Sequence, residues 1–298
     1  MPIFVDDITF ASKSKDALDK FVVDLGKHFK LRDLDETNYL LDVEITRNRK
    51  KQKLYLSQHQ YIINKLEEFN MSDCKPVGTP MLPGLKLMLE QCPKTSEEIN
   101  AINNIPYISA VGSLMYLAMM TRLDIAYIMA LLARFNHNPD EEHWKAVKHL
   151  FRYLKGTLDM KLEYGPDSTI GNEMFVTYSD ADHGGDRDSR KSTSGYMVKI
   201  GTGAVAWRSK LQPVVTRSAM EAEFIAAEAA GMEICWIQNI LKELRYMPTA
   251  SAKLYMDNQS SMSQPIYIPT EDMPADLLTK ALPKPQVEKL QRMMGLVM

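Results

Sequence analysis

The chain has 298 residues, which is room for about two domains at roughly 100–200 residues each. Hydrophobic residues at 45% and charged residues at 25% are typical of a globular protein and argue against disordered, collagen-like and membrane-embedded classes. The net charge of −2 gives no overall basic character, so any surface that binds nucleic acid must be local.

The first ten residues form a β-prone apolar run that two adjacent acids, Asp6 and Asp7, interrupt. A hairpin turn accounts for this pair, because Asp favours turns. A metal site accounts for it equally well, because Mg²⁺ prefers hard oxygen ligands such as carboxylates. From the residues alone, both interpretations stay open.

Helical and hairpin patterns follow the acidic pair, and the Pro- and Gly-rich stretch 71–104 interrupts them as an irregular linker. The predicted elements of this first half are a helix over 18–29, a hairpin over 41–56, and helices over 57–69, 107–119, 124–135 and 139–155.

The second half alternates strands with one long helix, and its first three strands predict an antiparallel meander. The predicted elements are strands over 175–180, 192–200 and 204–207, a helix over 220–244, a strand over 253–257, a short polar helical segment from 258, a strand over 266–268 and a helical turn from 276.

Four acids stand at the ends of these elements. Asp180 and Asp257 close strands, Glu223 lies in the first turns of the long helix, and Asp276 opens the last helical turn. Each acid alone is most simply a solvated surface residue. Strand ends and helix starts from separate segments can, however, converge and hold two Mg²⁺ ions. The four acids are therefore a candidate metal-binding and catalytic site.

Two groups of basic residues are candidates for a local surface that binds nucleic acid, although a solvated turn or strand edge is the simpler interpretation of each. The first group is Arg47, Arg49, Lys50, Lys51 and Lys53, and the second is Arg187, Arg190, Lys191, Arg208 and Lys210.

The first half carries motifs in a fixed order that resemble the reverse transcriptase of copia-type retrotransposons. They include Phe-Val-Asp-Asp at 4–7, Leu-Ser-Gln at 56–58, Thr-Pro at 79–80, Ser-Ala-Val-Gly-Ser-Leu-Met-Tyr-Leu-Ala at 109–118 and Arg-Tyr-Leu-Lys-Gly-Thr at 152–157. The resemblance implies a partial polymerase palm in which Asp6 and Asp7 are the metal-binding acids, followed by a helical connection and thumb. The family's other palm aspartate and its fingers are expected upstream of this turn. The chain alone is therefore expected to lack polymerase activity, and a complementary Pol fragment is considered as a partner.

The second half resembles the type 1 ribonuclease H of the same elements. The motifs are Tyr-Ser-Asp-Ala-Asp at 178–182, Ser-Thr-Ser-Gly-Tyr at 192–196, Glu-Ala-Glu at 221–223, Asp-Asn-Gln-Ser at 257–260 and Ala-Asp-Leu-Leu-Thr-Lys at 275–280. The resemblance implies that Asp180 bridges two Mg²⁺ or Mn²⁺ ions, that Glu223 and Asp257 hold one of them, and that Asp276 completes the other. It implies hydrolysis of the RNA strand of an RNA/DNA hybrid.

Two positions depart from the family pattern. His183 stands where copia-type elements usually have tryptophan, which we expect to matter little. A helix and a following motif are missing between the third acid and the strand that precedes the fourth, where only the residues 259–265 remain as a connection. A crossover between parallel neighbouring strands commonly needs about a dozen residues or more. We therefore expect Asp180, Glu223 and Asp257 to cluster and the strand over 266–268 to dock poorly, and we expect Asp276 to be the outlier if any of the four acids is one.

The expected fold is α+β, a partial palm with a helical connection and thumb followed by an RNase H-like mixed β-sheet flanked by helices. The expected domains are 1–70, 71–165 and 172–298. Two functions stay open: a Mg²⁺-dependent hybrid nuclease with an inactive polymerase remnant, and an inert transposon remnant that at most binds nucleic acid or has a structural role. The sequence offers no signal peptide, membrane span or disulfide framework, so we expect an intracellular protein of the cytoplasm or nucleus, not secreted and without a membrane partner.

Overall fold

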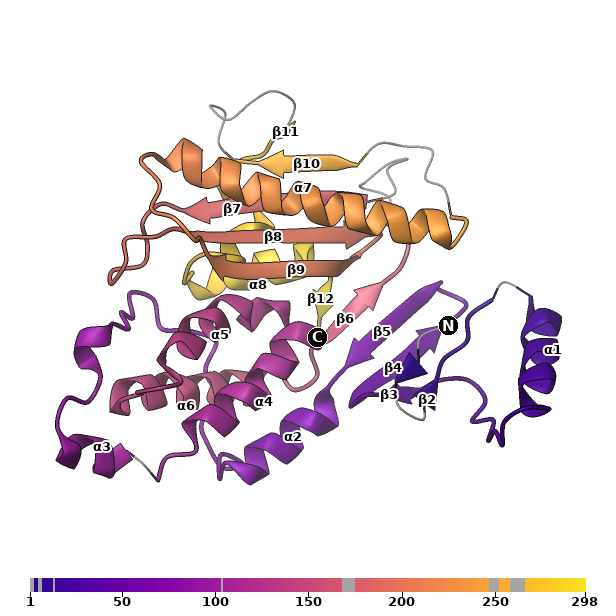
Figure 1. Ribbon diagram of the computed structural model, residues 1–298, viewed down its shortest axis with the longest axis horizontal. Coiled ribbons are helices and arrows are strands. Elements are labelled where there is room, and N and C mark those ends of the chain that lie inside the picture. Colours follow the sequence, from indigo (N-terminus) through magenta and orange to yellow (C-terminus); the bar gives the residue numbers. More distant parts are fainter. Residues whose placement is uncertain are drawn as a thin grey trace. The chain divides into compact units, whose positions relative to one another are not determined.

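The computed structural model mixes helices and strands along the chain, which confirms the predicted α+β class (Figure 1). It divides into two compact units, 1–41 and 42–298. The boundaries predicted near 70 and 165 lie inside the second unit and stay predictions. The described residues are 3–4, 7–12, 14–102, 104–167, 175–246, 252–257 and 266–298.

The first unit consists of two short strands, one helix and a third strand, and it has little core of its own. Strands β1 (Ile3–Phe4) and β2 (Asp7–Ile8) pair antiparallel, and Asp6 lies outside the described residues. Helix α1 (Lys15–Gly26) contains no buried residue, and β3 (Tyr39–Leu40) ends the unit.

A small antiparallel sheet opens the second unit. The predicted hairpin is confirmed as β4 (Val43–Asn48) and β5 (Lys53–Ser57). Two strands that were not predicted extend it, because β6 (Lys161–Tyr164) pairs with β5 and β12 (Leu296–Val297) pairs with β6. The last strand described in the chain therefore joins the sheet that begins with the early hairpin.

The helical part contains a large buried apolar cluster, to which α2, α4, α5 and α6 contribute. The linker prediction for 71–104 is wrong in part, since this stretch contains α3, and the single helix predicted over 124–135 is broken into η2, α5 and η3. The elements are α2 (His59–Glu68), η1 (Leu89–Gln91), α3 (Ser96–Ile102), α4 (Tyr107–Met120), η2 (Leu123–Ile125), α5 (Ala126–Leu132), η3 (Ala133–Phe135) and α6 (Glu141–Gly156). None of the helices in the described ranges is long and apolar enough to span a membrane.

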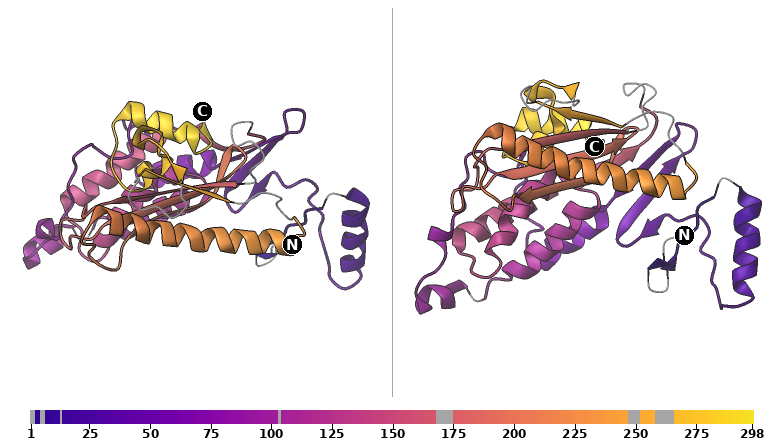
Figure 2. Two further views of the ribbon diagram at one scale, coloured as in Figure 1. Left: turned by 90° about the horizontal axis from the view of Figure 1, so that it is seen from above. Right: turned by 45° about the horizontal axis from the view of Figure 1, so that its top comes forward.

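A mixed five-stranded sheet with the order β11-β10-β7-β8-β9 forms the rest of the second unit. The predicted meander is confirmed by β7, β8 and β9, and β10 and β11 continue the sheet in parallel with β7. Helix α7 covers one face, while η7 and α8 lie on the other (Figures 1 and 2). The bounds are β7 (Phe175–Asp182), β8 (Thr193–Ile200), β9 (Gly203–Leu211), α7 (Ala219–Glu243), β10 (Lys253–Met256), β11 (Ile266–Tyr267), η6 (Thr270–Asp272), η7 (Pro274–Leu278) and α8 (Lys284–Met293). The helical segment predicted from 258 lies outside the described residues.

A fully buried ion pair connects the helical part to the C-terminal helix. Arg122 donates from Nε and Nη2 to the two carboxylate oxygens of Asp124 at 3.0 and 2.8 Å, and both residues are 1% exposed. The Tyr153 hydroxyl on α6 and the Gln291 amide on α8 donate to Asp124 Oδ2 at 2.6 and 2.8 Å. Burial alone would raise the pKa of Asp124, but the charge and hydrogen bonds of Arg122 outweigh burial and hold it below its usual value.

We predict that Asp124→Ala destabilises the chain by about 3–5 kcal/mol, because it leaves the Arg122 guanidinium buried without its counter-charge. Urea unfolding would measure the change. Glu142→Ala is the control, since Glu142 forms only an exposed ion pair with Lys145 and its loss should cost about 1 kcal/mol or less. Equal effects of the two substitutions would contradict the prediction.

Candidate metal centre

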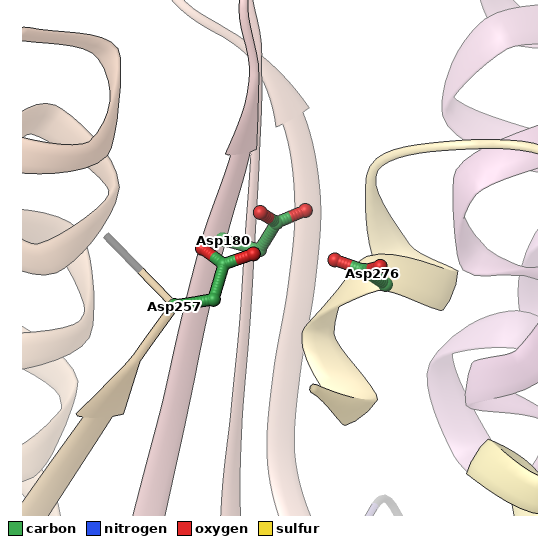
Figure 3. A group of neighbouring side chains, drawn as sticks. All are labelled: Asp180, Asp257 and Asp276. Carbon is green, nitrogen blue, oxygen red and sulfur yellow. The ribbon is translucent and has the colours of Figure 1, made fainter. Parts of the chain in front are cut away.

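Three carboxylates from separate segments converge at one edge of the mixed sheet (Figure 3). Asp180 and Asp257 stand at the carboxyl ends of the parallel neighbours β7 and β10, and Asp276 reaches them from η7. One carboxylate oxygen from each of the three lies within 4.8 Å of the others. Asp180 and Asp276 are each 1% exposed, and Asp257 is half-buried.

Glu223 lies beside this group and is not one of the three converging acids. It projects from the second turn of α7, is buried, and its Oε1 accepts a hydrogen bond from the Ala181 amide at 3.3 Å. Its Oε2 is buried without a hydrogen-bond partner in the described part of the chain. Burial first, and then the charges of Asp180 and Asp257, raise the pKa of Glu223 to about 8.

The expectation that Asp276 would be the outlier is wrong. Asp276 belongs to the converging group, and Glu223 is the acid that stands apart. The expectation was based on the length of the connection between β10 and η7. The position of Asp276 is determined instead by what η7 packs against.

Gly195 is the residue that lets η7 approach the sheet. It lies opposite Asp180 in the β7–β8 register, and a Cβ at this position would come within 2.7 Å of Thr279 Cγ2 and 2.8 Å of Leu278 Cβ. Contacts that close do not occur in native packing, so only glycine fits here. The Thr279 hydroxyl then donates a hydrogen bond to Asp180 Oδ2. Close packing therefore holds Asp276 beside Asp180.

The strand before the fourth acid pairs with the sheet over two residues only. β11 pairs in parallel with β10 through Tyr255–Ile266 and Met256–Tyr267. Immediately after it, the Thr270 hydroxyl donates to Asp257 Oδ2 at 2.8 Å. Two paired residues and one side-chain hydrogen bond are thus enough to bring this segment to the site.

The centre holds more negative charge than its surroundings neutralise. Burial, followed by the charge of Asp180, raises the pKa of Asp276 to about 7, and burial raises the pKa of Asp182 to about 6. Lys280 is the cation at the site, with Nζ 2.9 Å from Asp276 Oδ1 and 3.6 Å from Asp180 Oδ2. Burial disfavours its charge, but Asp180 and Asp276 outweigh burial and raise the pKa of Lys280.

Such an arrangement suits a hard divalent cation. Carboxylate oxygens from several segments meet at one spot, and the buried Oε2 of Glu223 lacks a hydrogen-bond partner among the described residues. Mg²⁺ and Mn²⁺ favour all-oxygen sites of this kind. A bound cation would lower the raised pKa values by favouring the ionised carboxylates.

The predicted nucleic-acid-binding residues fall into two places. Arg187, Arg190 and Lys191 lie in the connection between β7 and β8, whereas Arg208 and Lys210 are exposed on β9. Arg208 lines a hollow of ≈ 370 Å³ that also contacts Tyr196 and Trp236, on the side of the sheet that carries α7. The turn of the other basic group, 47–53, joins β4 to β5.

Thr279, Lys280 and Gly195 were not predicted as parts of the site from the sequence. The spacing of Asp276 and Lys280 was a usable signal, because an acid and a lysine four residues apart face each other on a helical turn. For Gly195, no signal in its own strand indicated which segment would pack on it.

Fold and site together define an α+β chain with a buried acidic centre at the edge of a mixed sheet. Residues 1–83 match the family model described as reverse transcriptase (RNA-dependent DNA polymerase). The chain is 38% identical over 324 residues to the retrovirus-related Pol polyprotein from transposon TNT 1-94 of Nicotiana tabacum, covering 99% of this chain and 24% of the relative. It is 33% identical over 326 residues to the Pol polyprotein from transposon RE1 of Arabidopsis thaliana, covering 99% and 21%.

A third relative is matched over most of its own length. It is a putative transposon Ty5-1 protein of Saccharomyces cerevisiae, 31% identical, with 78% of this chain and 72% of the relative covered. The chain belongs to the family of Pol polyproteins of copia-type retrotransposons, which confirms the resemblance of its motifs.

The chain matches only part of each Pol polyprotein, and the alignments contain gaps in this chain. The chain spans 21–24% of the length of the Pol polyproteins TNT 1-94, RE1 and RE2. Their aligned lengths of 324–328 exceed the 298 residues of this chain, so they contain residues that this chain lacks. No solved structure matches the chain.

We predict that Gly195→Ala destabilises the chain by about 1–3 kcal/mol, because the added methyl group overpacks the contact with η7. Gly231→Ala in α7 is the matched control, since nothing lies within 4 Å of its Cβ position; helix propensity should leave it neutral or up to about 1 kcal/mol more stable. Chemical denaturation of both variants measures the difference. A neutral Gly195→Ala would show that η7 does not depend on this close approach.

The metal-free protein should lose stability as the pH rises from about 5 to about 8. Glu223 has a pKa of about 8 in the folded chain against an ordinary value of 4.5. The native state therefore keeps a proton that the unfolded state has released, and each rise in pH favours unfolding until the folded pKa is passed. The loss should be on the order of a few kcal/mol. Unfolding free energies at several pH values measure it.

Two substitutions on the same helix test the source of this slope. Glu223→Gln should reduce the slope and leave the part that Asp276 and Asp182 contribute through their own raised pKa values. Glu228→Gln, at an exposed position of α7, should leave the slope unchanged. A slope as steep in Glu223→Gln as in the wild type would assign the proton to another group.

Proposed function

We propose that this chain binds divalent cations at Asp180, Glu223, Asp257 and Asp276 and hydrolyses the RNA strand of RNA/DNA hybrids. The observation that carries the proposal is the convergence of Asp180, Asp257 and Asp276, with their oxygens within 4.8 Å of one another. A structural remnant gains nothing from burying mutually repelling carboxylates, whereas a phosphoryl-transfer site needs them.

The topology supports the same proposal. Asp180 lies on the central strand of the sheet, with antiparallel β8 on one side and parallel β10 on the other. Helices cover both faces (Figure 2). A mixed sheet flanked by helices is the RNase H-like arrangement that the resemblance of the second half implies.

In this proposal each acid has a defined role. Asp180, centrally placed, would be shared by two Mg²⁺ or Mn²⁺ ions, Asp257 and Glu223 would help to hold one of them, and Asp276 would help to hold the other. When bound, the ions activate water and stabilise charge on the phosphoryl oxygens. Glu223 and Asp276 release their protons as the ions bind, so affinity for metal should rise with pH between about 6 and about 8.

The basic residues supply the contact with the substrate backbone. Arg187, Arg190 and Lys191 lie in the loop that follows β7, the strand of Asp180, and would pair with phosphates of the hybrid. Arg208 and Lys210 lie on β9 and would lengthen this surface. Partnership with a second Pol fragment stays a prediction.

We predict Mg²⁺-dependent cleavage of an RNA/DNA hybrid by the purified chain. Asp180→Asn should lower the rate by at least about 100-fold, since it removes the ligand shared by both ions. Asp257→Asn and Glu223→Gln should act in the same direction, and Glu228→Gln should retain the wild-type rate. A gel assay with labelled hybrid, single-stranded RNA and double-stranded RNA measures both rate and substrate class.

Two results would contradict the proposal. One is hydrolysis that Asp180→Asn leaves unchanged, which would point to a contaminating nuclease. The other is a folded wild-type chain that neither binds Mg²⁺ or Mn²⁺ nor cleaves the hybrid, which would favour the alternative of an inert transposon remnant.

A further inference from the structure

Lys280 stands where the acidic centre would receive a cation. It follows Asp276 by four residues, and its ammonium lies 2.9 Å from Asp276 Oδ1 and 3.6 Å from Asp180 Oδ2. Both carboxylates are buried, while the Lys280 side chain is 37% exposed. The backbone of Lys280 is thus fixed next to η7, and its ammonium lies between two acids that repel each other.

An ammonium and a divalent cation cannot both occupy this space. Asp180 and Asp276 are the two acids nearest to Lys280, and they belong to the group whose oxygens converge within 4.8 Å. A divalent ion bound there would repel the ammonium at a separation of a few ångströms in a partly desolvated site. The four-carbon stem of lysine is flexible, and its exposure leaves a route to solvent.

We propose that Lys280 is a tethered cation that occupies the acidic centre until a divalent ion displaces it. The inference rests on the proposed metal site. Without metal, Lys280 offsets the repulsion between Asp180 and Asp276 and keeps the two carboxylates in place. With metal, the ammonium swings toward solvent.

The expected consequence is a lower affinity for metal than the carboxylates alone would give. A ligand that binds only the state with the lysine withdrawn has an apparent affinity reduced by the fraction of molecules in that state. If the withdrawn state makes up about one tenth of the population, removing the ammonium tightens binding about tenfold. The carboxylates themselves are unchanged.

Calorimetric titration of Mn²⁺ and Mg²⁺ into the full chain tests this inference without measuring catalysis. Lys280→Met should bind either ion about tenfold more tightly than the wild type and should melt at a lower temperature before metal is added. Lys289→Met is the matched control: Lys289 forms a 2.7 Å ion pair with Asp272, also in the C-terminal segment, and its loss should leave metal affinity unchanged. Circular dichroism verifies folding, and Lys280→Gln replaces Lys280→Met if the latter does not fold.

The outcomes separate this inference from the proposed function. Equal or weaker metal affinity in Lys280→Met and Lys280→Gln, with a wild type that binds metal and cleaves hybrid, overturns the role of Lys280 alone. No metal binding in the wild type or in either Lys280 variant overturns both proposals. Binding that appears only when the lysine is replaced supports the tethered cation, because the wild-type ammonium is then the obstacle.

Discussion

The buried pair of Arg122 and Asp124 is the constraint on which the arrangement of the second unit depends. A guanidinium and a carboxylate can stay in a dry core only if every remaining hydrogen-bonding group finds a partner. For Asp124 those partners are Tyr153 of α6 and Gln291 of α8. For Arg122 the partner is Thr157 at the end of α6. The C-terminal helix is therefore tied to the helical part, and Leu123, next to the pair, belongs to the same buried cluster as residues of η7 and α8. Since η7 carries Asp276, the geometry of the acidic centre depends on a pair of charges that lies outside it.

The two buried groups of charges show opposite electrostatic behaviour. Asp124 is matched with Arg122, and its pKa lies below the usual value. Glu223 and Asp276 are under-neutralised, and their pKa values are raised to about 8 and about 7. Matched charges specify how elements pack, whereas unmatched charges destabilise the metal-free fold and are kept where a ligand supplies the missing charge. The contrast between the two supports a functional interpretation of the acidic centre.

Local patterns in the sequence predicted those helices and strands whose formation depends on neighbouring residues in the chain. Alternation gave the strands of the meander, and helical spacing gave α4, α6 and α7, because each pattern reports which face of an element is buried. The sequence analysis did not predict β6, β12 or α8. The two strands are short, and they pair with partners more than a hundred residues away in the sequence. The position of Asp276 was mispredicted for a related reason. Connection length limits how far a segment can reach, but the final place of η7 comes from its contact with Gly195, which no local pattern encodes.

Asp276 and Asp257 are held at the acidic centre in different ways. Asp276 is held by packing against the sheet, whereas Asp257 ends β10, whose outer neighbour β11 contributes only two paired residues, one of them 36% and the other 46% exposed. Edge segments with few hydrogen bonds and little buried surface open at low free-energy cost. The least secured acid of the centre is therefore Asp257, fixed on its outer side by β11 and the Thr270 hydroxyl. A cation that binds all three carboxylates would stabilise the closed edge by its preference for that state, so metal binding and the order of β10 and β11 should be coupled.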